Sequence, residues 1–200
     1  SFVKILDKIN PDIVVHCAAH PGGLSMKEPI KNINVNLLGS FRIIEWCSKN
    51  NSKLIFLSSS AVYGDQKIKK LKENSNLSPG TVYGINKVAC ESYIKELSKY
   101  NKFKWLIIRL FATYGANHKP NFYQGIINVI LTQLSLKRNL IIKGSLLRER
   151  DLIHSKDVGK IIIKLINKNI NNKIINVGTG KSTQINKIIK ICMKFLHKNN

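Results

Sequence analysis

Short apolar runs alternate with longer segments of helical periodicity along this chain, and this order is its most constraining feature. Strands joined by helices of ten or more residues are typical of βαβ units, in which the strands run parallel. The sequence therefore predicts an α/β protein with a mostly parallel sheet. The predicted strands are 12–17, 53–57, 105–110, 140–142 and 174–177, and the predicted helices are 33–50, 83–100, 126–136, 155–166 and 184–196.

Three local features refine this prediction. The β-branched run 12–17 has no polar alternation, so we expect that strand to be buried on both faces. In helix 83–100 a stripe with four-residue spacing predicts the packed face. Ser155 is a candidate N-cap, with Asp157 in the first turn of its helix. The stripe consists of Ile85, Ala89, Tyr93 and Leu97.

The strong positive charge does not predict a nucleic-acid partner. Lys and Arg number 33 against 11 acidic residues, a net charge of +22. Nucleic-acid binding surfaces usually gather Arg or Lys among stacking aromatic residues. Here the basic residues are overwhelmingly Lys and are spread along the chain, with the densest cluster at Lys67, Lys69, Lys70 and Lys72. We therefore expect a solvated, lysine-rich surface, and a basic binding module is kept only as an alternative.

Other residue types indicate a cytoplasmic protein without a membrane segment or metal. No apolar run approaches the ~20 residues that span a bilayer, and the first twenty residues lack the features of a signal peptide. Four cysteines are far apart in the sequence, so free thiols are expected rather than a zinc site or disulfides. The five histidines have no metal-ligand spacing. The cysteines are Cys17, Cys47, Cys90 and Cys192.

Two short motifs suggest proton-transfer chemistry. Tyr83 and Lys87 are four residues apart in a predicted helix, which places them on one face. A lysine ammonium within ~5 Å of a phenol favours the phenolate and lowers its pKa, so Tyr83 becomes a candidate base. A serine run, Ser58 to Ser60, directly follows the predicted strand 53–57 and could hold a substrate oxygen.

One further glycine motif, 178–182, imitates the end of a phosphate-binding P-loop. That loop requires a glycine five positions before Gly180, where Ile175 stands. A strand and turn are therefore the expected role of this segment.

Taken in order, the motifs resemble one enzyme family. The chain resembles the extended short-chain dehydrogenases/reductases of the nucleotide-sugar epimerase/dehydratase type, over about residues 12–191. Several segments carry the resemblance: Pro11–Ala19, Asn36–Ser40, Ser58–Gly64 with Tyr83–Lys87, Arg109–Gly115, Arg148–His154 with Asp157–Val158, and Asn176–Gly180.

The resemblance implies a partial Rossmann-type, doubly wound parallel sheet from which the first βαβ units are missing. Residues 1–115 would belong to the dinucleotide-binding domain. Residues 116–200 would be mainly a small substrate-binding α/β part, with some segments returning to the sheet. The glycine fingerprint of the family is absent, so we expect a chain truncated at its N-terminus and also at its C-terminus. An uncovered sheet edge would make the isolated chain poorly soluble or unstable.

The resemblance also implies the site residues. Ser59, Tyr83 and Lys87 would be catalytic. NAD, with NADP as the other possibility, would contact Tyr83 and Lys87 together with Ala18, Ala19, Asn36, Ser58 and Phe111. The nucleotide sugar would contact Ser59, Tyr83, Asn121 and Arg150, and the complete protein would be a homodimer. Two departures from the family pattern are Ala112, where many relatives have an asparagine, and Asn86, where they have a serine.

The residues after Ser59 favour one reaction among those of the family. Dehydratases of this type have Asp-Glu after the hydroxyl residue, where this chain has Ser60 and Ala61. Without an additional acid or base, 4-epimerisation through a 4-keto intermediate is the simplest outcome, with Tyr83 as the base. A dehydratase or reductase of the same family, or a catalytically inactive fragment, are the alternatives.

Overall fold

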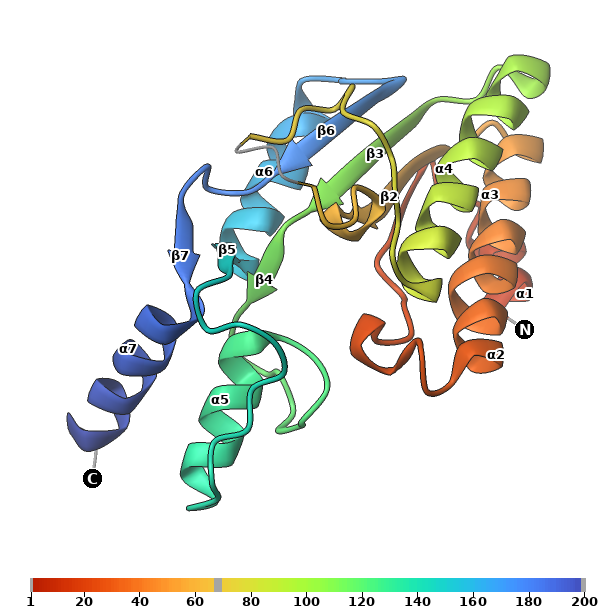
Figure 1. Ribbon diagram of the computed structural model, residues 1–200. Helices are drawn as coiled ribbons and strands as arrows, with labels where there is room; N and C mark the ends of the chain where they lie inside the picture. The colour runs from red at the N-terminus through yellow and green to blue at the C-terminus, as the bar shows by residue number, and fades with distance from the viewer. Residues whose placement is uncertain (1, 67–69, 199–200) are drawn as a thin grey trace. The chain divides into compact units, whose positions relative to one another are not determined.

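The computed structural model describes residues 2–66 and 70–198, and these form two compact units (Figure 1). The first unit comprises the chain up to Leu110 together with Leu165–Asn176. The second comprises Phe111–Lys164 and the chain from Val177 onward. The assignment of cofactor binding to 1–115 and of substrate binding to 116–200 stays a prediction.

A four-stranded sheet organises the first unit. Its order is β1 (Ile13–His16), β2 (Lys53–Ser59), β3 (Trp105–Leu110) and β6 (Lys173–Val177). The pairs β1–β2 and β2–β3 are parallel, with Ile13 opposite Lys53 and Leu54 opposite Trp105. Because parallel strands need crossover helices, this sheet confirms the α/β class and the parallel arrangement.

Helices pack on this sheet through one apolar core. They are α1 (Phe2–Ile9), α2 (Pro29–Asn32), the π-helical η2 (Ile33–Gly39), α3 (Ser40–Lys49) and α4 (Val82–Asn101). Figure 1 shows α3 and α4 side by side. The fully buried centre of this core includes Ile44, Cys47, Leu54, Phe56, Cys90, Ile94 and Ile107.

The turns before α2 and α4 fix where these helices begin. The predicted helix 33–50 begins earlier, at Pro29, whose fixed φ suits the first turn of a helix. Helix α4 is capped by Thr81, whose hydroxyl accepts a hydrogen bond of 3.1 Å from the N–H of Gly84. A 3₁₀ turn, η1 (Gly22–Leu24), lies between β1 and α2, and another, η3 (Ser60–Val62), follows β2.

The predicted burial of the first strand on both faces is wrong. Ile13 and Val15 keep 37% and 39% of their surface exposed, whereas His16 is buried. Strand β1 lies at the edge of the sheet, with β2 as its one neighbour. A β-branched run therefore marked the strand correctly but could not show how many layers would cover it.

The predicted packed stripe of α4 is correct at Leu97, which packs against the core, but wrong at Ile85 and Tyr93. Ile85 and Tyr93 are 53% and 43% exposed. The helix instead buries a face that includes Lys87, Cys90 and Glu91. Two charged side chains lie inward because each has a partner in the interior, and hydrophobic periodicity takes no account of such partners.

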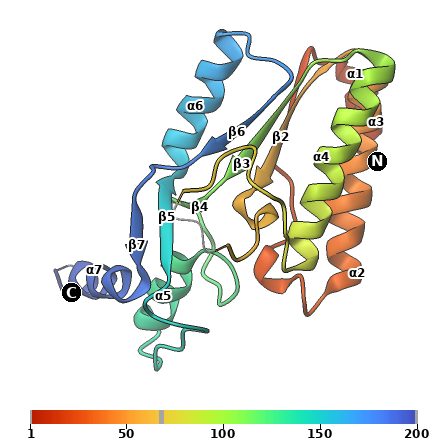
Figure 2. The same ribbon diagram turned by 45° about the horizontal axis from the view of Figure 1, so that its top comes forward.

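A smaller sheet organises the second unit. It contains β4 (Ala112–Tyr114), β5 (Glu149–His154) and β7 (Ser182–Gln184), with β4–β5 parallel and β5–β7 antiparallel. Helix α5 (Ile126–Ser135) packs against α7 (Ile185–Lys198), as Figure 2 shows. Helix α6 (Ser155–Asn167) begins in this unit. The buried residues between α5 and α7 are Ile130, Ile185, Ile188 and Cys192.

Two local predictions in the second unit are corrected. Residues 140–142 form no strand, because the side chain of Gln133 bonds both the N–H and the C=O of Ile141, at 2.8 and 3.2 Å. Ser155 is the first residue of α6 rather than its cap. The Nδ1 of His154 accepts a 3.2 Å hydrogen bond from the N–H of Lys156.

A helix that crosses a bilayer needs about 20 predominantly apolar residues. Among residues 2–66 and 70–198, none has both the length and the apolar character needed to cross a membrane.

Candidate active site

Ser59, Tyr83 and Lys87 lie together in the first unit. Ser59 is the last residue of β2, and Tyr83 and Lys87 belong to the first two turns of α4. The Ser59 hydroxyl accepts a 3.2 Å bond from the N–H of Ala61, and it lies near enough to the Tyr83 phenol to favour the ionised form of that group. The structure thus brings the predicted serine and tyrosine close together.

Lys87 is held in the interior below Tyr83. Its side chain is 2% exposed, and its Nζ donates to the carbonyl oxygen of Leu57 at 2.8 Å. The Nζ lies 4.5 Å from the ring centroid of Phe56 and 5.6 Å from that of Tyr83. Burial lowers the pKa of Lys87 from its ordinary value to about 8, because the charged form loses its hydration.

The expected lowering of the Tyr83 pKa is not found. Burial raises the pKa of the phenol above its ordinary value, and the hydrogen bond from Ser59 only partly opposes this effect. The ammonium of Lys87 is directed to the carbonyl of Leu57 rather than to the phenol oxygen. The four-residue spacing predicted the shared face correctly, but the balance between burial and charge depends on the surrounding protein.

The turn after β1 presents small residues at the edge of the sheet. Ala18 and Ala19 are exposed, whereas the next residue, His20, is buried. Asn36 is fully buried and bonds the backbone of His20 twice, accepting from its N–H at 2.7 Å and donating to its C=O at 3.0 Å. Asn36 therefore fixes the shape of the turn and does not itself face solvent.

Ser58 differs from its neighbour Ser59. Its side chain is 3% exposed and donates to the Oε1 of Glu91 at 2.5 Å. The hydroxyl is thus directed into the protein, and a contact between Ser58 and a cofactor stays a prediction.

A buried ion pair supports this site, and sequence analysis gave it no role. Arg109 and Glu91 are 2% and 1% exposed, and the Nη2 and Oε2 atoms are 2.6 Å apart. Arg109 also donates to the hydroxyl of Tyr63 at 2.9 Å. The pair connects β3 to α4 beside the active residues. The sequence feature that could have predicted this pair is Arg109, a charged residue within the apolar run 105–110, together with Glu91, four residues after Lys87.

The remaining predicted residues lie in the second unit. Phe111 directly precedes β4, and its N–H donates to the carbonyl of Val177 at 3.1 Å. Asn121 uses its Oδ1 to accept from the N–H groups of Tyr123 and Gln124, at 2.9 and 2.7 Å, and so organises its own loop. Arg150 is exposed on β5. The predicted substrate contacts of Asn121 and Arg150 stay predictions.

The second unit also contains a cavity of about 590 Å³. It lies among α5, α7 and the segment 114–118, and its lining includes neither Asn121 nor Arg150. Its walls combine apolar side chains with two imidazoles. Representative lining residues are His118, Ile127, Leu131, His154, Ile188 and Phe195.

The glycine-rich turn 178–180 binds a carboxylate of the chain itself. The Oδ1 of Asp151 accepts from the N–H of Thr179 and the Oδ2 from the N–H of Gly180, each at 2.8 Å. The same carboxylate accepts from the Thr179 hydroxyl at 2.6 Å. In the part of the chain that the structure describes, no group of three or more His, Cys, Asp or Glu residues could hold a metal ion.

Comparison with known sequences decides the family. The NAD dependent epimerase/dehydratase family matches residues 1–178, which is most of the chain. This chain belongs to that family. The predicted resemblance, including the Rossmann-type parallel sheet, is confirmed.

Similar proteins include several enzymes with different reactions. A putative UDP-glucose 4-epimerase of Methanocaldococcus jannaschii is 31% identical over 92% of this chain and 62% of its own length. Human dTDP-D-glucose 4,6-dehydratase is 27% identical over 100% of this chain and 57% of its own. The chain thus spans about three fifths of the length of these relatives.

A solved structure shows the same fold. It is a UDP-N-acetylglucosamine 4-epimerase from Methanobrevibacter ruminantium in complex with UDP-N-acetylmuramic acid. The two share 31% identity and a TM-score of 0.86, over 96% of this chain and 63% of the other.

Proposed function

We propose that this chain carries the catalytic residues of an NAD-dependent nucleotide-sugar 4-epimerase, with Tyr83 as the base. One observation supports the proposal above all others. Ser59 lies close enough to Tyr83 to favour the ionised form of its phenol, and Lys87 is fixed one helical turn further along the same helix by its bond to Leu57. A substrate hydroxyl in this position would meet a hydrogen-bonding partner and a proton acceptor at once.

The residues around the site fit NAD. Ala18 and Ala19 place small side chains just beyond the carboxyl end of β1, in a turn that Asn36 fixes through the backbone of His20. Within the described residues, the Nζ of Lys87 has one hydrogen-bond acceptor, the carbonyl of Leu57. An ammonium has three hydrogens, so two are left for the hydroxyls of a ribose.

Three side chains would then divide the work on the sugar. Ser59 would hold the oxygen at C4, and Tyr83 would take its proton. Lys87 would stabilise the phenolate, since with a pKa of about 8 it is mostly protonated at neutral pH. NAD, when bound, would take up hydride from C4 and return it to the opposite face of the ring.

The turn after Ser59 favours epimerisation over dehydration. Eliminating water requires an acid and a base in addition to the tyrosine. Residues Ser60 and Ala61 form η3 and carry no ionisable group. A dehydratase or reductase of the same family is the second candidate, since a dehydratase is among the similar proteins.

Replacing Tyr83 by Phe tests the assignment. In the complete gene product, turnover of UDP-hexoses, followed by NMR of the 4-epimeric product, should fall by about 10²–10⁴-fold. Binding of NAD, measured by calorimetry, should change little, because the ring and its packing remain. Wild-type turnover in the Tyr83→Phe variant would refute the role of Tyr83. Release of water from the substrate would favour the dehydratase.

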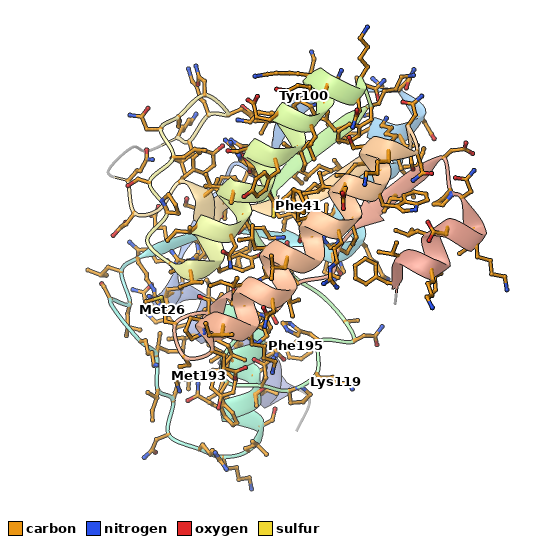
Figure 3. All side chains as sticks on the ribbon, turned by 90° about the vertical axis from the view of Figure 1, so that its right-hand side faces the viewer. Met26, Phe41, Tyr100, Lys119, Met193 and Phe195 are labelled. Carbon is orange, nitrogen blue, oxygen red and sulfur yellow. The ribbon has the colours of Figure 1, made fainter. Side chains whose placement is uncertain are left out.

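We also propose that the complete protein is a homodimer and that α3 and α4 form the interface. These helices and the preceding η2 carry an apolar surface that consists of the exposed Leu38, Ile85, Tyr93 and Tyr100 and the half-buried Phe41. The rings of Phe41 and Tyr93 lie 5.0 Å apart in a T-shaped arrangement. Figure 3 shows Phe41 and Tyr100 on this side of the first unit. A contiguous exposed apolar surface on a folded domain often marks a protein contact.

We place the enzyme in the cytoplasm. All four cysteines are free thiols in the structure, which suits a reducing compartment.

A further inference from the structure

Asn86 begins a chain of hydrogen bonds that runs from the interior to the partly exposed Glu28. It lies in α4 between Tyr83 and Lys87 and is 3% exposed. Its Nδ2 donates to the Oδ1 of Asn32 at 3.0 Å. The Nδ2 of Asn32, which is fully buried, lies 3.2 Å from the Nδ1 of His20. The other imidazole nitrogen, Nε2, lies 3.2 Å from the Oε2 of Glu28.

The direction of each bond in this chain follows from chemistry. The carboxylate of Glu28 only accepts hydrogen bonds, so the Nε2 of His20 carries the proton. The Nδ1 of a neutral imidazole then accepts, which suits the NH₂ group of Asn32. The donors therefore run in one direction from α4 to Glu28. The Nζ of Lys31 holds Glu28 at 3.1 Å.

His20 connects these hydrogen bonds to the turn after β1, which lies beside Tyr83. Its backbone is fixed by Asn36, and two residues later Gly22 lies directly against the ring of Tyr83. A Cβ placed on Gly22 would lie 3.2 Å from the Cγ and Cδ1 atoms of that ring. The ring thus contacts a turn whose position depends on Asn86, Asn32 and His20.

We propose that Asn86, Asn32 and His20 are positioning residues that hold the Tyr83 phenol in its reactive place. This inference rests on the proposed function. The hydrogen-bond chain connects α4, which carries Tyr83, to the turn that packs on the Tyr83 ring. It therefore fixes the distance between the helix and the turn, and the ring lies between them. A displacement of ~1 Å at a reacting group can cost about 100-fold in rate.

Paired substitutions in the complete gene product test the proposal. Asn86→Asp keeps the size of the side chain but sets two oxygens against each other, and His20→Leu removes both imidazole nitrogens. Each should lower kcat by about 10–100-fold while KM changes little. His20→Gln supplies an acceptor and a donor again and should restore most of kcat. Gly22→Ala, which crowds the ring directly, should lower kcat in the same way.

Asn101→Asp is the matched control for the amide-to-acid change. Asn101 is also in α4, and its Nδ2 donates to the Oγ of Ser48 at 2.7 Å, far along the helix from Tyr83. This variant should lose some stability and keep kcat. The proposal is overturned if Asn86→Asp keeps the wild-type kcat, or if His20→Gln is as impaired as His20→Leu. If Asn86→Asp does not fold, Asn86→Ala, which removes the amide that donates to Asn32, replaces it under the same criterion.

A second measurement does not depend on activity. The ¹⁵N spectrum of the His20 imidazole should show the neutral tautomer with its proton on Nε2, and Asn32→Leu should change this signal. A proton on Nδ1 in the wild type would overturn the chain even in an active enzyme. If the tautomer is as expected but no sugar is epimerised, the proposed function fails while the hydrogen-bond chain stands.

Discussion

The Nζ of Lys87 lies 2.8 Å from the carbonyl oxygen of Leu57, so a buried ammonium connects α4 to the residue of β2 that directly precedes the serine run. The same bond that positions Lys87 also gives the strand carbonyl of Leu57 a partner. Burying the Lys87 ammonium away from water still lowers the free energy of unfolding, and this effect depends on pH.

Stability should rise with pH as Lys87 loses its charge. Its pKa is about 8 in the folded chain and 10.5 when unfolded, so the unfolded state binds more protons between these values. The free energy of unfolding should rise across this window by on the order of 3 kcal/mol relative to Lys87→Met. Urea titrations of both proteins at pH 7, 8, 9 and 10.5 give the difference. An equal pH dependence in the two proteins would contradict the burial of this charge.

Stability should fall in acid because of His16. This imidazole is 5% exposed, and burial together with the charge of Lys87 lowers its pKa from 6.5 to about 4. A lowered pKa favours the neutral form, so the stabilisation is lost as pH falls from 6.5 to 4. Relative to His16→Gln, the loss should be on the order of 3 kcal/mol, measured by chemical denaturation.

Ser40→Ala is the control for His16. It removes the 2.9 Å contact between the Ser40 hydroxyl and Nε2 but leaves the imidazole in place. The steep acid dependence should survive in this variant. If it disappears, the hydroxyl rather than burial controls the titration.

Breaking the Arg109–Glu91 pair should be strongly destabilising. Glu91→Gln leaves the buried guanidinium without a counter-charge, which typically costs about 3–5 kcal/mol. Glu96→Gln is the matched control, since Glu96 forms an exposed pair with Lys99 in the same helix. Exposed pairs contribute about 0–1 kcal/mol. Thermal denaturation of the two variants should separate them clearly, and similar losses would argue against the interior pair.

The proposed dimer should dissociate when its apolar surface receives a charge. Tyr93→Glu places a carboxylate beside Phe41 at the centre of that surface, and light scattering after gel filtration should show a monomer. Ile163→Glu, at an exposed apolar position in α6, should leave the dimer intact. A monomeric wild-type protein would remove the basis for this interface.

Local patterns predicted the strands of the first unit and the shared helix face of Tyr83 and Lys87. Both depend on spacing along the chain, and spacing is visible in the sequence. The exposure of Ile13 and Val15, the inward face of α4 and the raised pKa of Tyr83 depend instead on what lies beside each element. Strands β4, β5 and β7 were missed: β4 and β7 have only three residues each, and β5 begins with three charged residues.

The hydrogen bonds of Asp151 explain why a phosphate-like motif near the end of the chain need not bind phosphate. The donors that would attract a nucleotide's oxygens are occupied by an anion that the polypeptide supplies. The Asp151 carboxylate is part of the chain and cannot diffuse away, and it connects β5 to the turn 178–180 as a crosslink would. Removing this carboxylate would leave the N–H groups of Thr179 and Gly180 free to bind another anion.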